Sequence, residues 1–223
     1  MKLTRNVVIC IAVTLLCVPL MRAQDLSKYR QFSLGTSLVG ISKQVDQRPG
    51  DATLVQQSPA TLQQMEWWPV PLNLLNGSEP VQKVIFSFYN HTLYKIEAVY
   101  DNEATAGLTA ADMIGAISPS YGTATKTAAD AGSHAVTSYG NVAPPLAQWE
   151  NGQNSVTLSR DSFLDTFHLI VLTTQVNAQA EASVIEAAKQ ERADAPQTEI
   201  ARGKKAADDL EIERQENLKT FRP

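Results

Sequence analysis

Cysteine is missing from nearly all of this 223-residue chain, because its two cysteines, Cys10 and Cys17, both lie close to the N-terminus. If that segment is removed, the rest of the chain can form no disulfide, and it offers no cysteine nucleophile and no thiolate ligand for a metal. We therefore expect the mature fold to be held together by its own apolar core.

Histidine is almost as scarce, and His91, His134 and His168 are the three imidazoles of the sequence. No two of them are spaced as metal ligands on one helix would be, so we predict no metal site. His91 is interpreted as a turn residue, His134 as part of a loop of small residues and His168 as a strand residue. A phosphate-binding loop that ends in Gly-Lys-Ser/Thr is also lacking, and we predict no cofactor.

No local motif marks a catalytic centre. The segment Gly35-Thr36-Ser37-Leu38-Val39 lacks the second glycine of the turn that α/β-hydrolases build around their nucleophile, and Ser37 is better explained as a helix cap. Residues 101–112 carry oxygen-bearing side chains in the order of a calcium loop, but Ala106 stands where the sharp turn requires glycine. The sequence therefore predicts no catalytic residue, and it disfavours an enzyme without deciding the question.

Basic charge is also low, and the formal net charge of the chain is −4. Removing Lys2, Arg5 and Arg22 with the N-terminal segment changes this charge to −7. A chain this acidic repels phosphate backbones, and no basic stripe interrupts it. We therefore predict that the protein binds neither nucleic acid nor anionic lipid.

The N-terminus has the three parts of a secretion signal: basic residues, the apolar run of residues 7–20, and a short polar exit that ends at Ala23. This run is shorter than the roughly 20 apolar residues of a transmembrane helix. We predict that residues 1–23 are a signal peptide and that the mature chain has no transmembrane segment. The protein would then be exported to the periplasm or the extracellular space.

The clearest strand pair covers residues 81–88 and 92–100. An odd-length loop between them places apolar residues on one face of the pair and charged residues on the other. We therefore predict a three-residue loop, Tyr89-Asn90-His91, with His91 in the left-handed conformation, and Lys83 opposite Glu97. The predicted apolar face carries Val84, Phe86, Phe88, Tyr94, Ile96 and Ala98.

Other segments complete the prediction of an α+β domain. A second hairpin is indicated by Asn151-Gly152, and residues 167–172 are apolar on both faces, which is typical of a strand in the middle of its sheet. Two short helices precede the strands. One begins near Thr36 or Ser37, and the other begins at Thr109 with Asp112 as its capping-box partner.

Residues 24–174 therefore predict short helices packed on an antiparallel sheet. Two parts of this domain, about residues 29–105 and 106–174, each contain a threonine-led short helix, then Gly-x-Ala-Thr, then tryptophan ahead of strands. Duplication of a helix-plus-sheet unit and chance similarity both explain this echo, and the sequence leaves the choice open.

The segment Phe32-Ser33-Leu34-Gly35-Thr36-Ser37 leads into a short helix and later an aromatic-rich hairpin. In this it resembles the small exported α+β modules typified by the beta-lactamase-inhibitor protein and by outer-membrane assembly lipoproteins of the SmpA/OmlA type. The resemblance covers roughly residues 29–174 as a pattern with no diagnostic motif, and the lipobox of the lipoprotein members is missing. It implies protein binding rather than catalysis, and it transfers no functional residue to this chain.

Beyond residue 174 the chain becomes rich in alanine and in charged residues. We predict a charged tail over residues 175–223 that is helical or partly disordered, with one helix over residues 176–195, a break at Pro196 and a second helix over residues 197–219. Its apolar residues are too widely spaced for a stripe that faces a core, so we expect the tail to be solvated.

Trp67, Trp68 and Trp149 are the candidate binding residues. Because Trp67 and Trp68 are adjacent in a strand-like stretch, strand alternation sends them to opposite faces. An exposed tryptophan is a favoured anchor at protein interfaces, whereas packing under loops or the tail would give these rings a structural role instead.

Together these features favour an exported, non-catalytic binding or interaction module of a bacterial-type envelope, whose partner would be another envelope or secreted protein. Two alternatives stay open. The protein could be a secreted hydrolase whose Ser, His and Asp residues come together on folding, or an envelope-structural protein that docks through its tail.

Overall fold

The computed structural model describes residues 24–69, 80–127, 135–136, 142–143, 145–161 and 164–222. The predicted signal peptide and His134 lie outside the described residues. The fold combines helices with an eight-stranded antiparallel sheet, so the prediction of an α+β fold is confirmed. Among the described residues, no helix is both long and apolar enough to cross a bilayer.

The main sheet has the strand order β3-β4-β5-β6-β12-β11-β10-β7, and β6 and β12 lie at its centre. Each half of the sheet is built the same way, because a helix is followed by strands that run from an outer edge to the middle. Duplication of this unit and chance similarity both stay open as explanations. The strands are β3 (Thr53–Gln56), β4 (Leu62–Trp67), β5 (Val81–Tyr89), β6 (Thr92–Tyr100), β7 (Lys126–Thr127), β10 (Pro145–Glu150), β11 (Asn154–Asp161) and β12 (Thr166–Thr173).

Smaller elements accompany this sheet. The strands β1 (Lys28–Tyr29) and β2 (Phe32–Ser33) form a short hairpin, and β8 (Ala135–Val136) pairs with β9 (Val142–Ala143). The helix α1 (Leu38–Gln44) and the 3₁₀ helix η1 (Pro49–Asp51) precede β3, and α2 (Ala110–Tyr121) precedes β7.

The hairpin of β5 and β6 corrects our prediction of its loop. Tyr89 pairs with Thr92, so the loop is the two-residue turn Asn90-His91. Both turn residues have positive φ angles, 47° and 65°, which is the geometry of the tight turn that best fits the twist of a hairpin. The left-handed conformation of His91 is thereby confirmed.

A bulge in β6 contains the one extra residue that we had placed in the loop. Phe88 pairs with Leu93 and Ser87 pairs with Lys95, so Tyr94 is the extra residue. Beyond the bulge, Phe86 pairs with Ile96 on the predicted apolar face. Tyr94 does not lie on that face, and its place in the core is taken by Leu93.

The same register corrects the predicted cross-strand pair of charges. Glu97 lies opposite Ile85, and Lys83 lies opposite Val99. The pairing is displaced by two residues, because the turn is one residue shorter than we predicted and the bulge at Tyr94 adds one residue more. Lys83, Lys95 and Glu97 still lie on the face of the hairpin opposite the main core, as predicted from alternation.

The predicted helix starts are confirmed. The Ser37 hydroxyl accepts a hydrogen bond from the backbone nitrogen of Gly40 at the start of α1. At α2, the Thr109 hydroxyl accepts from the Asp112 nitrogen, and the Asp112 carboxylate accepts from the Thr109 nitrogen. This reciprocal pair satisfies two backbone donors that a helix start otherwise leaves unbonded.

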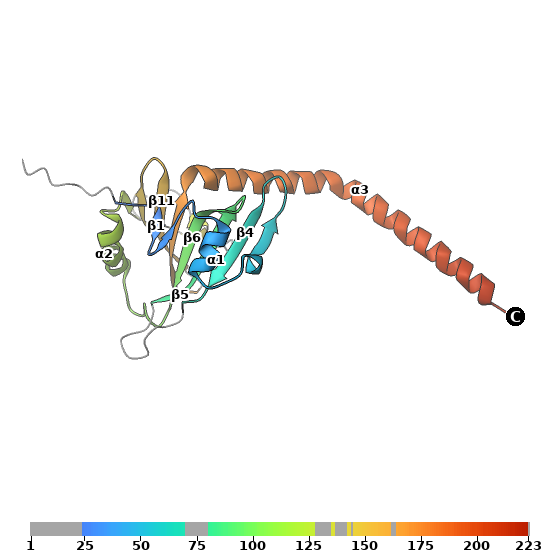
Figure 1. Ribbon diagram of the computed structural model, residues 1–223, viewed down its shortest axis with the longest axis horizontal. Helices are drawn as coiled ribbons and strands as arrows, with labels where there is room; N and C mark the ends of the chain where they lie inside the picture. Colours follow the sequence, from blue (N-terminus) through green and yellow to red (C-terminus); the bar gives the residue numbers. More distant parts are fainter. Residues whose placement is uncertain are drawn as a thin grey trace, which may run out of the picture.

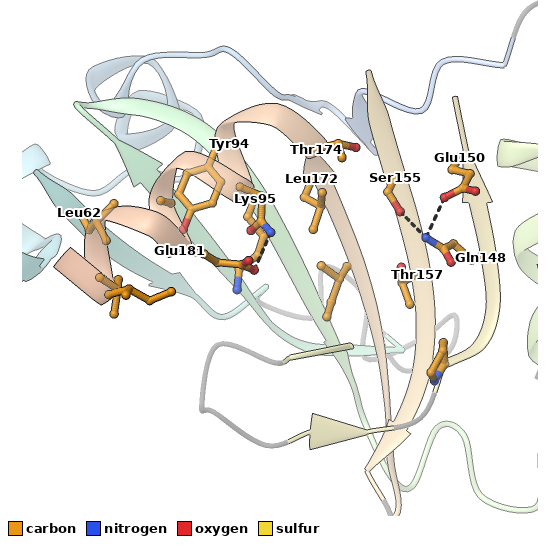
Figure 2. A pocket seen from close by; sticks show the side chains of 16 residues that line it. Leu62, Tyr94, Lys95, Gln148, Glu150, Ser155, Thr157, Leu172, Thr174 and Glu181 are labelled. Carbon is orange, nitrogen blue, oxygen red and sulfur yellow. Dashed lines mark hydrogen bonds between the residues drawn. The ribbon is translucent and has the colours of Figure 1, made fainter. Parts of the chain in front are cut away.

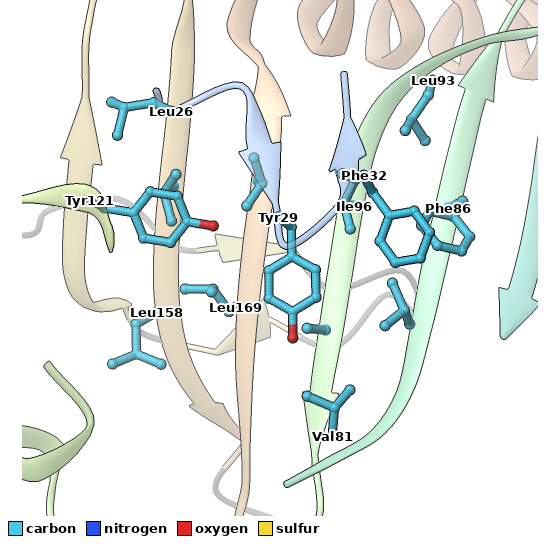
Figure 3. Packing of buried hydrophobic residues seen from close by; sticks show 14 of the residues in the cluster. Leu26, Tyr29, Phe32, Val81, Phe86, Leu93, Ile96, Tyr121, Leu158 and Leu169 are labelled. Carbon is cyan, nitrogen blue, oxygen red and sulfur yellow. The ribbon is translucent and has the colours of Figure 1, made fainter. Parts of the chain in front are cut away.

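One face of the sheet carries the main core, which the β1–β2 hairpin, α1 and α2 cover. Figure 3 shows Tyr29 and Phe32 of the hairpin, and Tyr121 of α2, over this face. Phe32 is fully buried, with its ring centroid 4.8 Å from that of Phe86 and 5.5 Å from that of Trp67. The Tyr121 hydroxyl of α2 donates to the carbonyl oxygen of Lys28 at 2.7 Å. Aromatic contacts therefore join the β1–β2 hairpin to the sheet, and a hydrogen bond joins α2 to the hairpin.

The tail forms one helix, α3 (Thr174–Thr220), which passes through Pro196 without a break. Our prediction of two helices is wrong because proline removes one backbone hydrogen bond and here bends the helix rather than ending it. Figure 1 shows α3 changing direction partway along and projecting away from the sheet. Its first turns are not solvated as we expected, since Ala180 and Ser183 are buried against the domain.

Candidate functional site

A groove of about 650 Å³ lies between the first three turns of α3 and the sheet face opposite the main core. This volume is in the range of sites that hold small ligands or short peptide segments. The walls are aliphatic, and the floor carries uncharged polar side chains from β11 and β10. The aliphatic lining residues are Leu62, Ile170, Leu172, Val184 and Ile185.

Lys95 is the one positively charged residue among the described residues that line this groove. It lines the groove from β6, and burial lowers the pKa of its ammonium group, although the carboxylates of Glu97 and Glu181 act in the opposite direction. Lys95 forms no ion pair and no side-chain hydrogen bond with any residue that the structure describes. A partly desolvated ammonium without a partner is well suited to receive an anionic group.

Tyr94 and Glu181 lie beside Lys95 at one end of the groove (Figure 2). Burial, together with the nearby Glu181 carboxylate, raises the pKa of the Tyr94 phenol to about 12, so the phenol stays neutral at ordinary pH. The Glu181 carboxylate accepts a hydrogen bond from the Asn177 side chain at 2.8 Å. Tyr94 reaches this position because the bulge turns it away from the core.

The other end of the groove is polar and already ordered by hydrogen bonds (Figure 2). The Gln148 side-chain nitrogen donates to the Ser155 hydroxyl and to the Glu150 carboxylate, both at 3.1 Å. Lys126 neutralises Glu150 through an ion pair of 2.6 Å. This end therefore offers amide and hydroxyl groups rather than unbalanced charge.

The three candidate tryptophans do not line this groove. Trp149 is only 1% exposed, and its indole nitrogen donates to the Gly122 carbonyl at 2.8 Å, so its ring belongs to the core. Trp67 packs against Phe32, whereas Trp68 is 53% exposed. The structure thus leaves Trp68 as the one of the three whose ring could meet a partner.

A second cluster lies on the same sheet face but is closed to solvent. The Nδ1 atom of His168 lies 2.9 Å from a carboxylate oxygen of Glu97, and Ser159 is directly opposite His168 on β11. All three side chains are buried. Neither His168 Nε2 nor Ser159 Oγ has a hydrogen-bond partner in the described part of the chain.

Serine, histidine and glutamate are the residue types of a catalytic triad, but these three residues do not have the geometry of one. A serine nucleophile needs a hydrogen bond to its base, and the reacting atoms need access to substrate. The Ser159 hydroxyl does not bond to the imidazole, and none of the three residues lines the groove. The cluster is therefore better described as a buried polar network.

In the loop that resembles a calcium-binding loop, residues 101–112, the acidic side chains form hydrogen bonds within the loop itself. The Asp101 carboxylate accepts hydrogen bonds from the backbone nitrogens of Glu103 and Ala104, both at 2.9 Å. Asp112 is committed to the cap of α2. Among the described residues, no group of three His, Cys, Asp or Glu side chains is arranged to hold a metal.

Sequence reasoning missed the groove because its residues come from six separate elements, namely β4, β6, β10, β11, β12 and α3. Lys95 and Tyr94 belong to β6, Ser155 to β11, and Glu181 to α3. The sequence holds one signal, which is that Lys95 stands directly between Tyr94 and Ile96, because a lysine among apolar neighbours is rarely buried unless it is paired. We had assigned it to a solvated face.

Comparisons with protein-family models, curated proteins and solved structures find no match to this chain. The resemblance to the exported α+β modules therefore stays a prediction.

Proposed function

We propose that this protein is an exported, non-catalytic binding module, and that the groove beneath α3 receives an apolar chain that carries a carboxylate. The partner is a segment of another envelope or secreted protein. The observation that supports the proposal most directly is the Lys95 ammonium, which has no ion-pair partner among the residues that the structure describes, in a groove with aliphatic walls.

A peptide suits the groove better than a simple hydrocarbon acid does. The floor offers Gln148, Ser155 and Thr157, whose amide and hydroxyl groups can donate to and accept from peptide groups. The aliphatic walls would hold the side chains of the segment, and Lys95 would hold a C-terminal or side-chain carboxylate. Charge-assisted hydrogen bonds of this kind are about twice as strong as neutral ones.

Calorimetric titration of residues 24–223 with an acetylated tetrapeptide of leucine and valine tests this proposal. We expect binding of the peptide with a free C-terminal carboxylate and at least about tenfold weaker binding of its amide, because losing a charged hydrogen bond costs about 1.5–3 kcal/mol. Dodecanoate is the third probe. Its binding in place of the peptide would contradict a peptide partner.

Variants locate the interaction. Lys95→Met keeps the length of the side chain but removes its charge, and we expect it to bind the free-acid peptide as weakly as the native protein binds the amide. Lys43→Met, which lies on α1 over the opposite face, serves as the matched control and should bind normally. Glu181→Gln removes the negative charge beside Lys95 and should tighten binding. Equal affinity of Lys95→Met and the native protein would refute the assignment.

The hydrolase alternative has one observation in its favour, which is the buried polar network of Glu97, His168 and Ser159. We favour binding because these groups are buried and lack the serine–histidine hydrogen bond. Assaying ester hydrolysis by the native protein and by His168→Ala separates the two functions. Turnover that disappears with His168 would establish the hydrolase instead.

A further inference from the structure

Glu181 is an acidic residue on the side of α3 that faces the groove. The α3 residues that line the groove recur at helical spacing, and Glu181 stands among them next to Ala180 and one turn before the aliphatic pair Val184 and Ile185. Residues three and four positions apart share one face of a helix. The exposed carboxylate of Glu181 therefore lies at the rim of the groove, beside its apolar wall.

Glu181 and Lys95 carry opposite charges at the same end of the groove, but they do not form an ion pair (Figure 2). Burial lowers the pKa of the Lys95 ammonium, and the Glu181 carboxylate is close enough to act in the opposite direction. In the described part of the chain, the side chain of Asn177 is the one hydrogen-bond partner of Glu181, at 2.8 Å. One such bond leaves most of the acceptor sites of a carboxylate free.

The third charged residue that lines the groove is already neutralised. Glu150, at the other end, pairs with Lys126 at 2.6 Å and accepts a hydrogen bond from Gln148. Among the described residues that line the groove, Lys95 and Glu181 therefore carry the two charges that a ligand could balance. A ligand with a carboxylate alone would be attracted by Lys95 and repelled by Glu181.

We propose, as an extension of the function proposed above on which this inference rests, that the bound segment ends in a basic residue and that Glu181 selects for it. The terminal carboxylate binds Lys95, and the ammonium or guanidinium group of the same residue binds Glu181. Both groups branch from one Cα atom, so a single residue reaches the sheet side and the helix side of the groove. Charge complementarity of this kind contributes mainly to specificity.

The net negative charge of the chain favours basic peptides in general, so the test must separate Glu181 from the other acidic residues. Glu186 is the matched control. It lies on the same helix five residues further along, pairs with Lys189 at 3.7 Å, and does not line the groove. Glu186→Gln and Glu181→Gln thus remove the same charge from the same helix, and Glu181→Gln alone removes it from the groove.

Calorimetric titration of residues 24–223 with three acetylated tetrapeptides tests the proposal. The peptides share Leu-Val-Leu and a free C-terminal carboxylate, and they end in lysine, methionine or glutamate. We expect the native protein to bind the lysine peptide about two- to fivefold more tightly than the methionine peptide, which is the range of an exposed ion pair. The glutamate peptide should bind most weakly. Glu181→Gln should bind the lysine and methionine peptides equally, whereas Glu186→Gln should keep the native preference.

The outcomes separate this inference from the function on which it rests. Equal affinity of the native protein for the three peptides, or a preference for lysine that survives in Glu181→Gln, would show that Glu181 does not select the ligand. Absence of binding by all three peptides would contradict the proposed function as well. Free lysine is the fourth probe, and binding as tight as that of the lysine peptide would show that the groove takes an amino acid and would overturn the proposal. Thermal unfolding of both variants checks that the domain is intact.

Discussion

The imidazole of His168 and the carboxylate of Glu97 meet at 2.9 Å although 71 positions separate them in the chain, and both side chains are buried. The two residues lie diagonally across β12 and β6, since His168 pairs with Val99 and Glu97 pairs with Ile170. Because the pair is buried, replacing either residue should lower the stability of the domain. The polar group that remains would have no hydrogen-bond partner, and water could not take the place of that partner.

We predict that Glu97→Met or His168→Leu alone lowers the free energy of unfolding by about 2–4 kcal/mol. The double variant should recover most of that loss, since apolar residues of similar size replace both polar groups. Urea denaturation of the native protein, the single variants and the double variant measures the coupling. A double variant whose loss equals the sum of the single losses would show that the pair does not act as a unit.

Gly122 ends α2 with a φ angle of 87° and a ψ angle of −162°, a conformation that is nearly restricted to glycine. A Cβ atom added there would also collide with the side chain of Gln24. We therefore predict that Gly122→Ala lowers the free energy of unfolding by about 1–3 kcal/mol.

Gly115 provides the comparison within the same helix, because it is exposed and an added Cβ atom would meet open space. Gly115→Ala should raise the free energy of unfolding by up to about 1 kcal/mol through the better helix propensity of alanine. If thermal or urea denaturation gave both variants the same sign, the strained cap would not be the cause.

Lys95 should cost the domain stability at neutral pH, which is a common property of binding residues. Burial lowers the pKa of its ammonium group, so the folded state holds this proton less tightly than the unfolded state does. The resulting cost is complete below the lowered pKa of the folded state, and it disappears as the pH rises past the ordinary lysine value of 10.5.

We accordingly predict that Lys95→Met raises the free energy of unfolding by about 0.5–2 kcal/mol at pH 7, the usual size of a stabilising substitution. The gain should shrink when denaturation is repeated at pH 9 and pH 10. A gain that is constant with pH, or a loss of stability at pH 7, would show that the ammonium is not the source of the cost.

Export can be tested on the protein itself. If residues 1–23 are a signal peptide, the protein recovered from outside the cytoplasm begins at Gln24. Its intact mass and N-terminal sequence measure the cleavage site directly. Recovery of the full-length chain from the cytoplasm alone would contradict the predicted export.

The β5–β6 hairpin shows what alternation in a sequence can and cannot define. Alternation correctly placed Phe86, Ile96 and Lys95 on their faces. When one face of a strand is buried, a shift of one residue would move every apolar side chain to the wrong face. Alternation did not define the position of the one extra residue in the hairpin. An extra residue in the loop and an extra residue in a strand bulge change the pattern of faces in the same way. The bulge at Tyr94 therefore moved one aromatic side chain from the predicted core to the groove.

The helix starts were predictable because capping is local, whereas the groove was not. Ser37 and Thr109 act within three residues of themselves. Lys95 and Glu181, in contrast, come together only after β6 has paired with β12 and α3 has folded back over the sheet. That pairing joins the ends of the two halves, and no local pattern encodes it. Pro196 likewise signals a disturbed helix without stating whether the helix bends or stops.

Methyl nuclear magnetic resonance of residues 24–223, titrated with the free-acid tetrapeptide, tests most directly whether the groove is the binding site. We predict saturable shifts in the methyl signals of Leu62, Ile170, Leu172 and Ile185, with no shift in that of Ile41 in the opposite core. Shifts confined to residues outside the groove, or unchanged spectra at millimolar peptide, would contradict the account.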